Sequence, residues 1–356
     1  MEKQRGFCYN LEKAKGDELP MTRIYVVRHA EAEGNVYRRM HGQYESGITA
    51  NGRRQIQALS QRFRDIPVDA CYTSDLIRTQ ITAKAVSVPQ NLPLHLEPAF
   101  REIAAGTWEN VPFGWLYTYD LTRMKQFDDE PENWYVEGAE NFSSCTDRFI
   151  NGLKRVGEQH PDGTVCVFTH GGVIRGMLRR LFPDAVVGHS DNTAVTLLEY
   201  ESGSFRAVYI NDNSHLNDEI STLARQSWWK EDEAERILDR NLWFREERVA
   251  LQPLTPPDAP IVFTAYFEEA PVGTLCLQYL DDSTGQLLYM GLIPEFRGTG
   301  LAIQLLGQAV FYFREKGKAT LLLQVPENQP AVLQLCRGQG MVQENDRFTL
   351  DLRLRV

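Results

Sequence analysis

The sequence predicts an α/β protein with more than one domain, and three observations support this prediction. The chain has 356 residues, which is typical of two domains or of three. Short apolar runs such as Ile24–Val27 and Val165–Phe168 are each followed by a helical pattern, as in parallel sheets that are buried on both faces. Hairpin-like strands over Ile261–Leu280 then indicate a change of architecture in the last third of the chain.

The overall composition narrows the function and the compartment. The chain is 42% hydrophobic and 24% charged, as expected of a globular protein. A net charge of −10 without a basic stripe argues against nucleic acid as a partner. No apolar run reaches membrane-spanning length, and the polar N-terminus lacks a signal-peptide core. The six cysteines are scattered, which is typical of a reducing cytoplasm and not of disulfides or zinc. The oligomeric state stays open.

Two histidines follow two of the predicted strands. The strand Ile24–Val27 runs into Arg28 and His29, and the strand Val165–Thr169 runs into His170. Ligands of α/β sheets bind at the carboxyl ends of the strands, so both histidines are expected in one divided site. A single histidine at a strand end is more often an ordinary hydrogen-bonded residue, and this alternative weakens only as further residues join the set.

A third strand–helix junction adds a positive charge to this site. The segment Asp69–Ser74 is predicted as a strand, and Arg78 falls in the first turn of the helix after it. A helix N-terminus and a guanidinium can act on the same anion. The combined set predicts a pocket for a compact dianion such as phosphate, which arginine binds in bidentate fashion. Its members are Arg28, His29, Arg78, His170 and the amide of Gly171.

Several motifs recur in an order that resembles the histidine phosphatase (phosphoglycerate mutase-like) superfamily over about residues 21–216. They are Arg28-His29-Ala30-Glu31 with Asn35, Arg39 with Gly42, Ile48–Gln55, Ser74–Ala83, Arg101–Ile103, Gly106–Glu109, Glu137–Glu140 and His170–Gly172. The resemblance implies a three-layer α/β/α fold with a mostly parallel sheet and hydrolysis of a small phosphomonoester without a metal. Ala30 and Asn110 stand where glycine is commoner in the family.

The residues also suggest roles for this chemistry. His29 is expected to attack phosphorus and form a phosphohistidine, and the neighbouring arginine charges lower its pKa and keep it neutral. His170, Arg28 and Arg78 would bind the phosphate oxygens as charge redistributes. The resemblance places Asn35 and Gly171 in the same phosphate-binding set.

Glu102 is expected to be the general acid, because a phosphate dianion beside it favours its protonated form. The alternative for Glu102 is a surface salt bridge to Arg101.

An aromatic-rich stretch between Glu109 and Glu137 would form a lid over the site. It indicates a substrate with apolar or ring character, or aromatic residues that only pack the lid in place, and both interpretations stay open. The stretch is short for a phosphoglycerate mutase, so a phosphatase is expected, with the mutase as an alternative. The aromatic residues are Phe113, Trp115, Tyr117, Tyr119, Phe127, Trp134 and Tyr135.

Three segments outside these motifs complete the expected organisation. Residues 1–20 precede the first strand and are expected to form a flexible arm. Residues 218–248 show a highly charged helical pattern with Trp228, Trp229, Trp243 and Phe244 as apolar anchors, and a proline-rich loop follows.

A second phosphate-binding signal lies in the last third of the chain. A strand over Leu287–Leu292 leads through a glycine turn into a helix from Leu301 to about Arg314. Glycines there let backbone amides approach a pyrophosphate. With the strand Thr320–Val325 and Gly340-Met341, residues 217–356 resemble the GCN5-related acetyltransferase (GNAT) family, which implies a mixed sheet and acetyl-CoA as the cofactor. The implied cofactor-binding residues are Leu292, Ile293, Arg297, Gly298, Thr299, Gly300, Leu301, Ala302 and Asn328.

One departure bears on acetyl transfer. Cys336 stands near a position where many GNAT proteins have a tyrosine that protonates the departing thiolate, and no general base can be assigned. Three functional classes follow. The chain is a bifunctional phosphatase and acetyltransferase, or a phosphatase with a CoA-binding regulatory or structural domain, or a binding protein without turnover. The complete phosphatase residue set disfavours the third.

Overall fold

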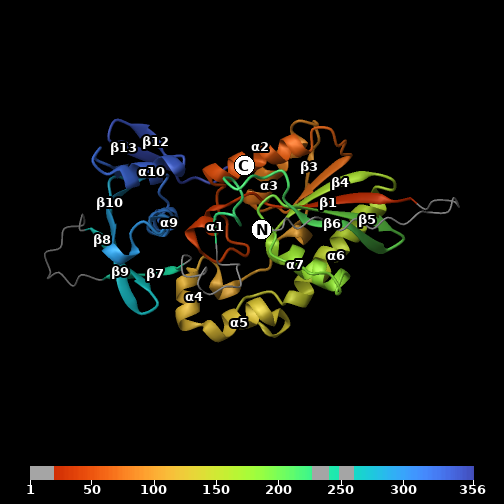
Figure 1. Ribbon diagram of the computed structural model, residues 1–356, viewed down its shortest axis with the longest axis horizontal. Helices are drawn as coiled ribbons and strands as arrows, with labels where there is room; N and C mark the ends of the chain where they lie inside the picture. The colour runs from red at the N-terminus through yellow and green to blue at the C-terminus, as the bar shows by residue number, and fades with distance from the viewer. Residues whose placement is uncertain (1–19, 227–239, 248–259) are drawn as a thin grey trace.

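The computed structural model describes residues 20–226, 240–247 and 260–356, which form two sheets with separate hydrophobic cores (Figure 1). The α/β prediction is confirmed, with a mostly parallel first sheet and a mixed second sheet. Residues 1–19 of the expected arm, Trp228, Trp229 and most of the proline-rich loop lie outside the described residues.

The first sheet has six strands in the order β3-β2-β4-β1-β5-β6. Four of them run parallel, and a β5–β6 hairpin continues the sheet antiparallel to β1. The strands are β1 (Thr22–Arg28), β2 (Ala70–Thr73), β3 (Leu94–Leu96), β4 (Thr164–Thr169), β5 (Val195–Glu201) and β6 (Ser204–Asp212).

Helices cover both faces of this sheet, which explains the unbroken apolar runs of β1 and β4. Figure 1 shows α2 (Ala50–Arg62) and α3 (Ile77–Ser87) on one side. On the other side lie α6 (Phe142–Gln159) and α7 (Gly171–Leu181). Alternate residues of each strand enter the two core layers, so the domain has the expected helix–sheet–helix arrangement.

Short helices build the lid and the loops at the edge of the sheet. In the expected lid, Phe127 and Trp134 pack on each other and on Trp108 of η2 with ring centroids 5.0–6.0 Å apart, whereas Trp115, Tyr119 and Tyr135 are exposed. Part of the aromatic stretch therefore only packs the lid. The short elements are α1 (Glu33–Tyr37), η1 (Pro98–Phe100), η2 (Gly106–Trp108), α4 (Phe113–Tyr119), α5 (Leu121–Asp129) and η3 (Pro131–Asn133).

The second sheet has seven strands in the order β12-β13-β11-β10-β9-β8-β7, and its β10–β11 pair is parallel. Its elements are β7 (Leu242–Glu247), β8 (Ile261–Phe267), β9 (Ala270–Tyr279), β10 (Thr284–Leu292), η4 (Pro294–Phe296), α9 (Ala302–Glu315), β11 (Thr320–Gln324), α10 (Pro330–Gly338), β12 (Val342–Glu344) and β13 (Arg347–Asp351).

The helical prediction was wrong for Trp243 and Phe244, which lie on β7. This strand pairs along its whole length with β8, and Leu242 and Trp243 are buried. Strand pairing and burial at the edge of the sheet therefore override the charged, helix-like local pattern.

The two domains pack closely against each other. Tyr37 of α1 belongs to the hydrophobic core of the second domain. A Cβ atom added to Gly307 of α9 would lie 2.4 Å from the Tyr37 ring, so only glycine permits this approach. The same holds for Gly114 of α4, where a Cβ would lie 2.5 Å from the Leu242 backbone.

Truncating a core phenylalanine should destabilise the first domain. Phe149 of α6 is fully buried, with its ring 5.5 Å from that of Phe100. We expect Phe149→Ala to lower the free energy of unfolding by about 3–5 kcal/mol, because it removes apolar contacts and leaves a cavity. Val186→Ala is the control, since Val186 is 96% exposed and should change stability by less than about 0.5 kcal/mol. Equal denaturant midpoints for both variants would contradict this packing.

Candidate active site

The two predicted histidines meet at one edge of the first sheet. In the β1–β4 register Arg28 pairs with Thr169, so His29 and His170 leave adjacent strands side by side. The backbone N–H of His29 donates to the Thr169 carbonyl at 2.9 Å, and the two imidazole centroids lie 5.3 Å apart. The two histidines expected in one divided site thus lie together at this edge of the sheet.

The imidazole of His29 is held in one orientation. Its Nδ1 lies 2.8 Å from the carbonyl oxygen of Ala30. A carbonyl only accepts, so Nδ1 carries the proton and Nε2 keeps a free lone pair. Burial, followed by the charges of Arg78 and Arg28, holds the pKa of His29 well below its usual value. The ring is therefore neutral, as a nucleophile requires.

Positive charge and unpaired donors surround these rings. Arg78 is buried and Arg28 is half-buried, and desolvation lowers the pKa of each guanidinium. The Nε atoms of both arginines and Nδ1 of His170 are buried, with no hydrogen-bond partner in the described part of the chain. Gly171 lies beside them, because a Cβ there would be 3.1 Å from Arg28 Nε. Such an arrangement suits a multivalent anion.

Glu102 lies at the N-terminus of α7, next to this pocket. Its carboxylate accepts hydrogen bonds from the amides of Gly172 at 2.8 Å and Val173 at 3.0 Å. The alternative salt bridge with Arg101 does not form, because Arg101 pairs with Asp75. Arg148 holds the loop by donating to the Glu102 carbonyl at 2.9 Å and pairing with Glu140.

Asn35 is hydrogen-bonded to the loop that follows His29. Its side-chain oxygen accepts from the Ala32 amide at 2.9 Å and from the Asn192 amide group at 3.3 Å. Asn192 also donates to the His29 carbonyl at 2.9 Å. Asn35 and Asn192 therefore fix the backbone that carries the His29 ring.

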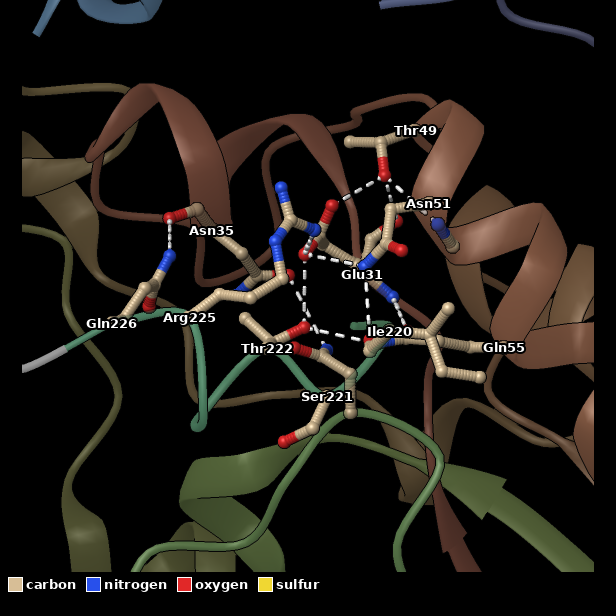
Figure 2. A network of polar contacts seen from close by, with 12 residues as sticks. Glu31, Asn35, Thr49, Asn51, Gln55, Ile220, Ser221, Thr222, Arg225 and Gln226 are labelled. Atoms are coloured by element: carbon tan, nitrogen blue, oxygen red, sulfur yellow. Dashed lines mark hydrogen bonds and ion pairs between the residues drawn. The ribbon is translucent and has the colours of Figure 1, made fainter. Parts of the chain in front are cut away.

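The carboxylate of Glu31 is the centre of a buried polar network (Figure 2). It accepts from Thr49 Oγ1 at 2.7 Å, Asn51 Nδ2 at 3.0 Å and Thr222 Oγ1 at 3.0 Å. Arg225 lies 3.5 Å away as an ion-pair partner. Figure 2 shows residues 220–226 lying beside Glu31, so a segment beyond the last strand of the first sheet holds the Glu31 carboxylate in place.

Several residues for which the sequence predicts no role make hydrogen bonds around the two histidines and the loops beside them. Ser74 lies 3.0 Å from Nε2 of His170. Glu109 accepts from the amides of residues 42–44, and Asp191 accepts from the amides of Thr222 and Leu223. Ser74 and Glu109 lie inside recognised motifs, which could have pointed to them, whereas nothing in the sequence marks Asp191.

Positive charge continues along α7 beyond the phosphate pocket. Burial lowers the pKa of Arg175, and the charge of Arg179 lowers it further. Desolvation, followed by the charges of Arg175 and Arg28, lowers the pKa of His189 to about 4. The surroundings of the pocket therefore favour anionic substrates.

The predicted pyrophosphate loop precedes α9 in the second domain. Gly298 and Gly300 have φ angles of +74° and +82°, and a Cβ at either position would meet no atom within 4 Å. Arg297 Nε donates to the Leu292 carbonyl and Thr299 Oγ1 to the Phe296 carbonyl, both at 2.8 Å. The loop thus places open backbone at the N-terminus of a 14-residue helix.

The strands beside this loop separate. β10 and β11 pair only as far as Leu287 and Leu323, and a bulge follows in β10 before Tyr289. Tyr289–Leu292 keep their pairing with β9, so their other edge has no ladder partner among the described residues. Ile293 is exposed next to them, and Asn328 is exposed between β11 and α10.

Cys336 packs in the core of the second domain and does not face this gap. It is fully buried, and burial raises the pKa of its thiol to about 11. A thiol in this position is unsuited to proton donation at the separated strands.

Within the described residues, no cluster of three or more His, Cys, Asp or Glu side chains could hold a metal ion. In the same residues, no helix has both the length and the apolar content needed to cross a bilayer.

Comparisons with known proteins agree with this geometry. Residues 24–213 match the histidine phosphatase superfamily (branch 1), and residues 220–341 match the acetyltransferase (GNAT) family. The chain is 27% identical over 200 residues to the uncharacterized phosphatase PhoE of Bacillus subtilis, covering 55% of this chain and 98% of that protein. It is 28% identical over 204 residues to a metal-independent phosphoserine phosphatase of Arabidopsis thaliana, covering 56% of this chain and 85% of that protein.

A solved structure, Bacillus stearothermophilus YhfR, superposes with a TM-score of 0.53 at 28% identity, over 55% of this chain and all of that one. The matched residues contain His29, His170, Arg28 and Arg78. The chain therefore belongs to the histidine phosphatase superfamily (branch 1), as a phosphatase domain followed by a GNAT acetyltransferase domain.

Proposed function

We propose that the first domain hydrolyses a small phosphomonoester through a phosphohistidine on His29, without a metal. We propose further that the second domain binds acetyl-CoA and transfers its acetyl group. One observation carries the phosphatase proposal. A neutral histidine with a free Nε2 lies beside a second histidine and two arginines whose buried Nε donors have no partner in the described residues.

In the first step, Nε2 of His29 attacks phosphorus in line with the ester oxygen. The N–P bond forms as the P–O ester bond breaks, and the departing oxygen takes a proton from the carboxyl group of Glu102. Arg28, Arg78 and His170 stabilise the charge on the other phosphate oxygens, and the amide of Gly171 at the start of α7 contributes to the same set.

In the second step, water attacks the phosphohistidine. The carboxylate of Glu102 takes a proton from this water, the N–P bond breaks, and inorganic phosphate leaves. His29 is neutral again and Glu102 is protonated, so the cycle can repeat. Asn35 acts by holding the His29 backbone through Asn192.

We favour a phosphatase over a mutase because the lid, residues 110–136, is short. The positive charge around Arg175 suits a phosphorylated metabolite, such as the phosphoserine that names one relative. The unpaired cysteines of the described residues support a reducing cytoplasm as the compartment.

The residues of the second domain fit acetyl-CoA. The amides of the 297–302 loop would hold its pyrophosphate, since both glycines leave the approach open. The free edge of β10 could pair with the amide groups of its pantetheine arm. When bound, the cofactor supplies a thioester as the acetyl donor. If assays of an amine panel with acetyl-CoA give no product, the domain is a CoA-binding regulatory or structural module instead.

The covalent mechanism predicts a labelled protein. A radiolabelled phosphate donor should leave acid-labile phosphate on the wild type, whereas His29→Ala should lose both label and turnover, because the nucleophile is gone. The matched control is His95→Ala. His95 lies exposed on β3 of the same sheet, so this variant should keep both the label and the turnover. Turnover retained by His29→Ala would rule out a phosphohistidine at this position.

Turnover should not require a divalent ion. The positive charge of the pocket comes from Arg28 and Arg78, so we expect the rate to stay within error after exhaustive dialysis against EDTA. A loss of activity that magnesium or zinc restores would contradict the metal-independent mechanism.

CoA should stabilise the second domain. Ligand at 100 times its dissociation constant contributes about 2.7 kcal/mol. This raises the melting temperature by several degrees, at about 2–8 °C per kcal/mol depending on domain size. Gly300→Glu should abolish the shift, because it places a side chain in the loop whose negative charge repels the pyrophosphate of CoA.

The matched control for the CoA experiment is Gly317→Glu. Gly317 also has a positive φ and open surroundings, but it lies after the other end of α9, so its variant should retain the shift. No shift in the wild type with millimolar CoA or acetyl-CoA would refute cofactor binding.

A further inference from the structure

The position of Arg78 depends on the loop between α1 and α2. Its Nη1 donates to the Tyr44 carbonyl at 3.0 Å and its Nη2 to the Gly42 carbonyl at 2.5 Å. The guanidinium is planar, and its donors form a rigid fork. Two accepted bonds from one loop therefore set the direction of the remaining Nε–H, which is buried with no partner among the described residues.

Helix α9 of the second domain covers the outer side of this loop. Phe311 is 1% exposed, and its ring centroid lies 5.9 Å from that of Tyr37, 5.7 Å from His41 and 5.8 Å from Tyr44. The guanidinium of Arg39 lies over the same ring at 4.9 Å. One side chain of the second domain thus packs against four residues in or next to the loop.

Ion pairs and hydrogen bonds hold α9 at both ends of the loop. Arg314 makes a bidentate pair with Glu33 at 2.8 and 2.9 Å, and Glu33 also accepts from the Gly47 amide at 2.9 Å. At the other end, Arg39 donates to Gln308 Oε1 at 3.0 Å. Phe311 lies four residues after position 307 and three after 308, and Arg314 lies three residues further on, so one face of α9 makes all these contacts.

We propose that Phe311 and Arg314 are positioning residues of the phosphatase. They hold the 38–47 loop from the second domain, and the loop carbonyls in turn orient Arg78 toward the phosphate. The catalytic domain is then complete only with α9 in place. This inference rests on the phosphate-binding role proposed above for Arg78.

The test compares Phe311→Leu with Tyr312→Leu, using p-nitrophenyl phosphate as substrate and inorganic phosphate as inhibitor. Tyr312 is the next residue of α9, but its ring packs on Phe263 of the second sheet. We expect Phe311→Leu to lower kcat/KM about 10- to 100-fold and to weaken phosphate inhibition, because small displacements of a binding group are costly. Tyr312→Leu should keep both values near those of the wild type.

A double-mutant cycle shows whether Phe311 acts through Arg78. If it does, Phe311→Leu should have little further effect on an Arg78→Lys background. Effects that multiply, or equal kinetics for the folded Phe311→Leu and Tyr312→Leu proteins, would overturn the proposal. Should Phe311→Leu fail to fold, Arg314→Lys takes its place, because it keeps the charge but loses the bidentate geometry. An Arg78→Lys protein with wild-type kinetics would instead refute the proposed phosphate site.

Discussion

The register of β1 against β4 is the constraint on which the rest of the site depends. These strands are neighbours, run parallel and pair Arg28 with Thr169, so the two histidines emerge together. Both strands are buried on both faces, with Ile24, Val26 and Val167 on one side and Val27 and Phe168 on the other. A slip by one residue would exchange the faces of every side chain. The reacting groups are therefore placed by the least deformable part of the domain.

The two neighbouring guanidinium groups of Arg28 and Arg78 also need hydrogen-bond acceptors, because they are largely removed from water. Loss of hydration disfavours their charged form, and backbone carbonyls of three loop residues compensate in part. Those loops need support in turn. Glu109 accepts from the amides of residues 42–44, and Asp191 and Glu31 both accept from residues 222–223. Carboxylates thus hold the segments around the two arginines.

Helix α9 links the two halves of the chain. Its N-terminus carries the open glycine loop, and its other half packs on α1 and the loop that holds Arg78. The loop proposed to bind CoA and the loop that holds Arg78 therefore both adjoin this one helix.

The sequence by itself determined the features that depend on neighbouring residues. Apolar runs marked β1 and β4, the residues after them marked His29 and His170, and glycines at 298 and 300 marked the turn before α9. The α/β class followed from these local patterns, and the order of the motifs carried the resemblance to both families.

Only the tertiary structure decided the contacts between distant residues. Thr222 binds Glu31 across 191 positions, and Arg314 binds Glu33 across 281 positions. The charged pattern around Trp243 suggested a helix, but pairing with β8 made it a strand. Such partners could not be predicted because a local pattern encodes which face of a segment is apolar or charged. Which surface that face will meet depends on the folding of the whole chain.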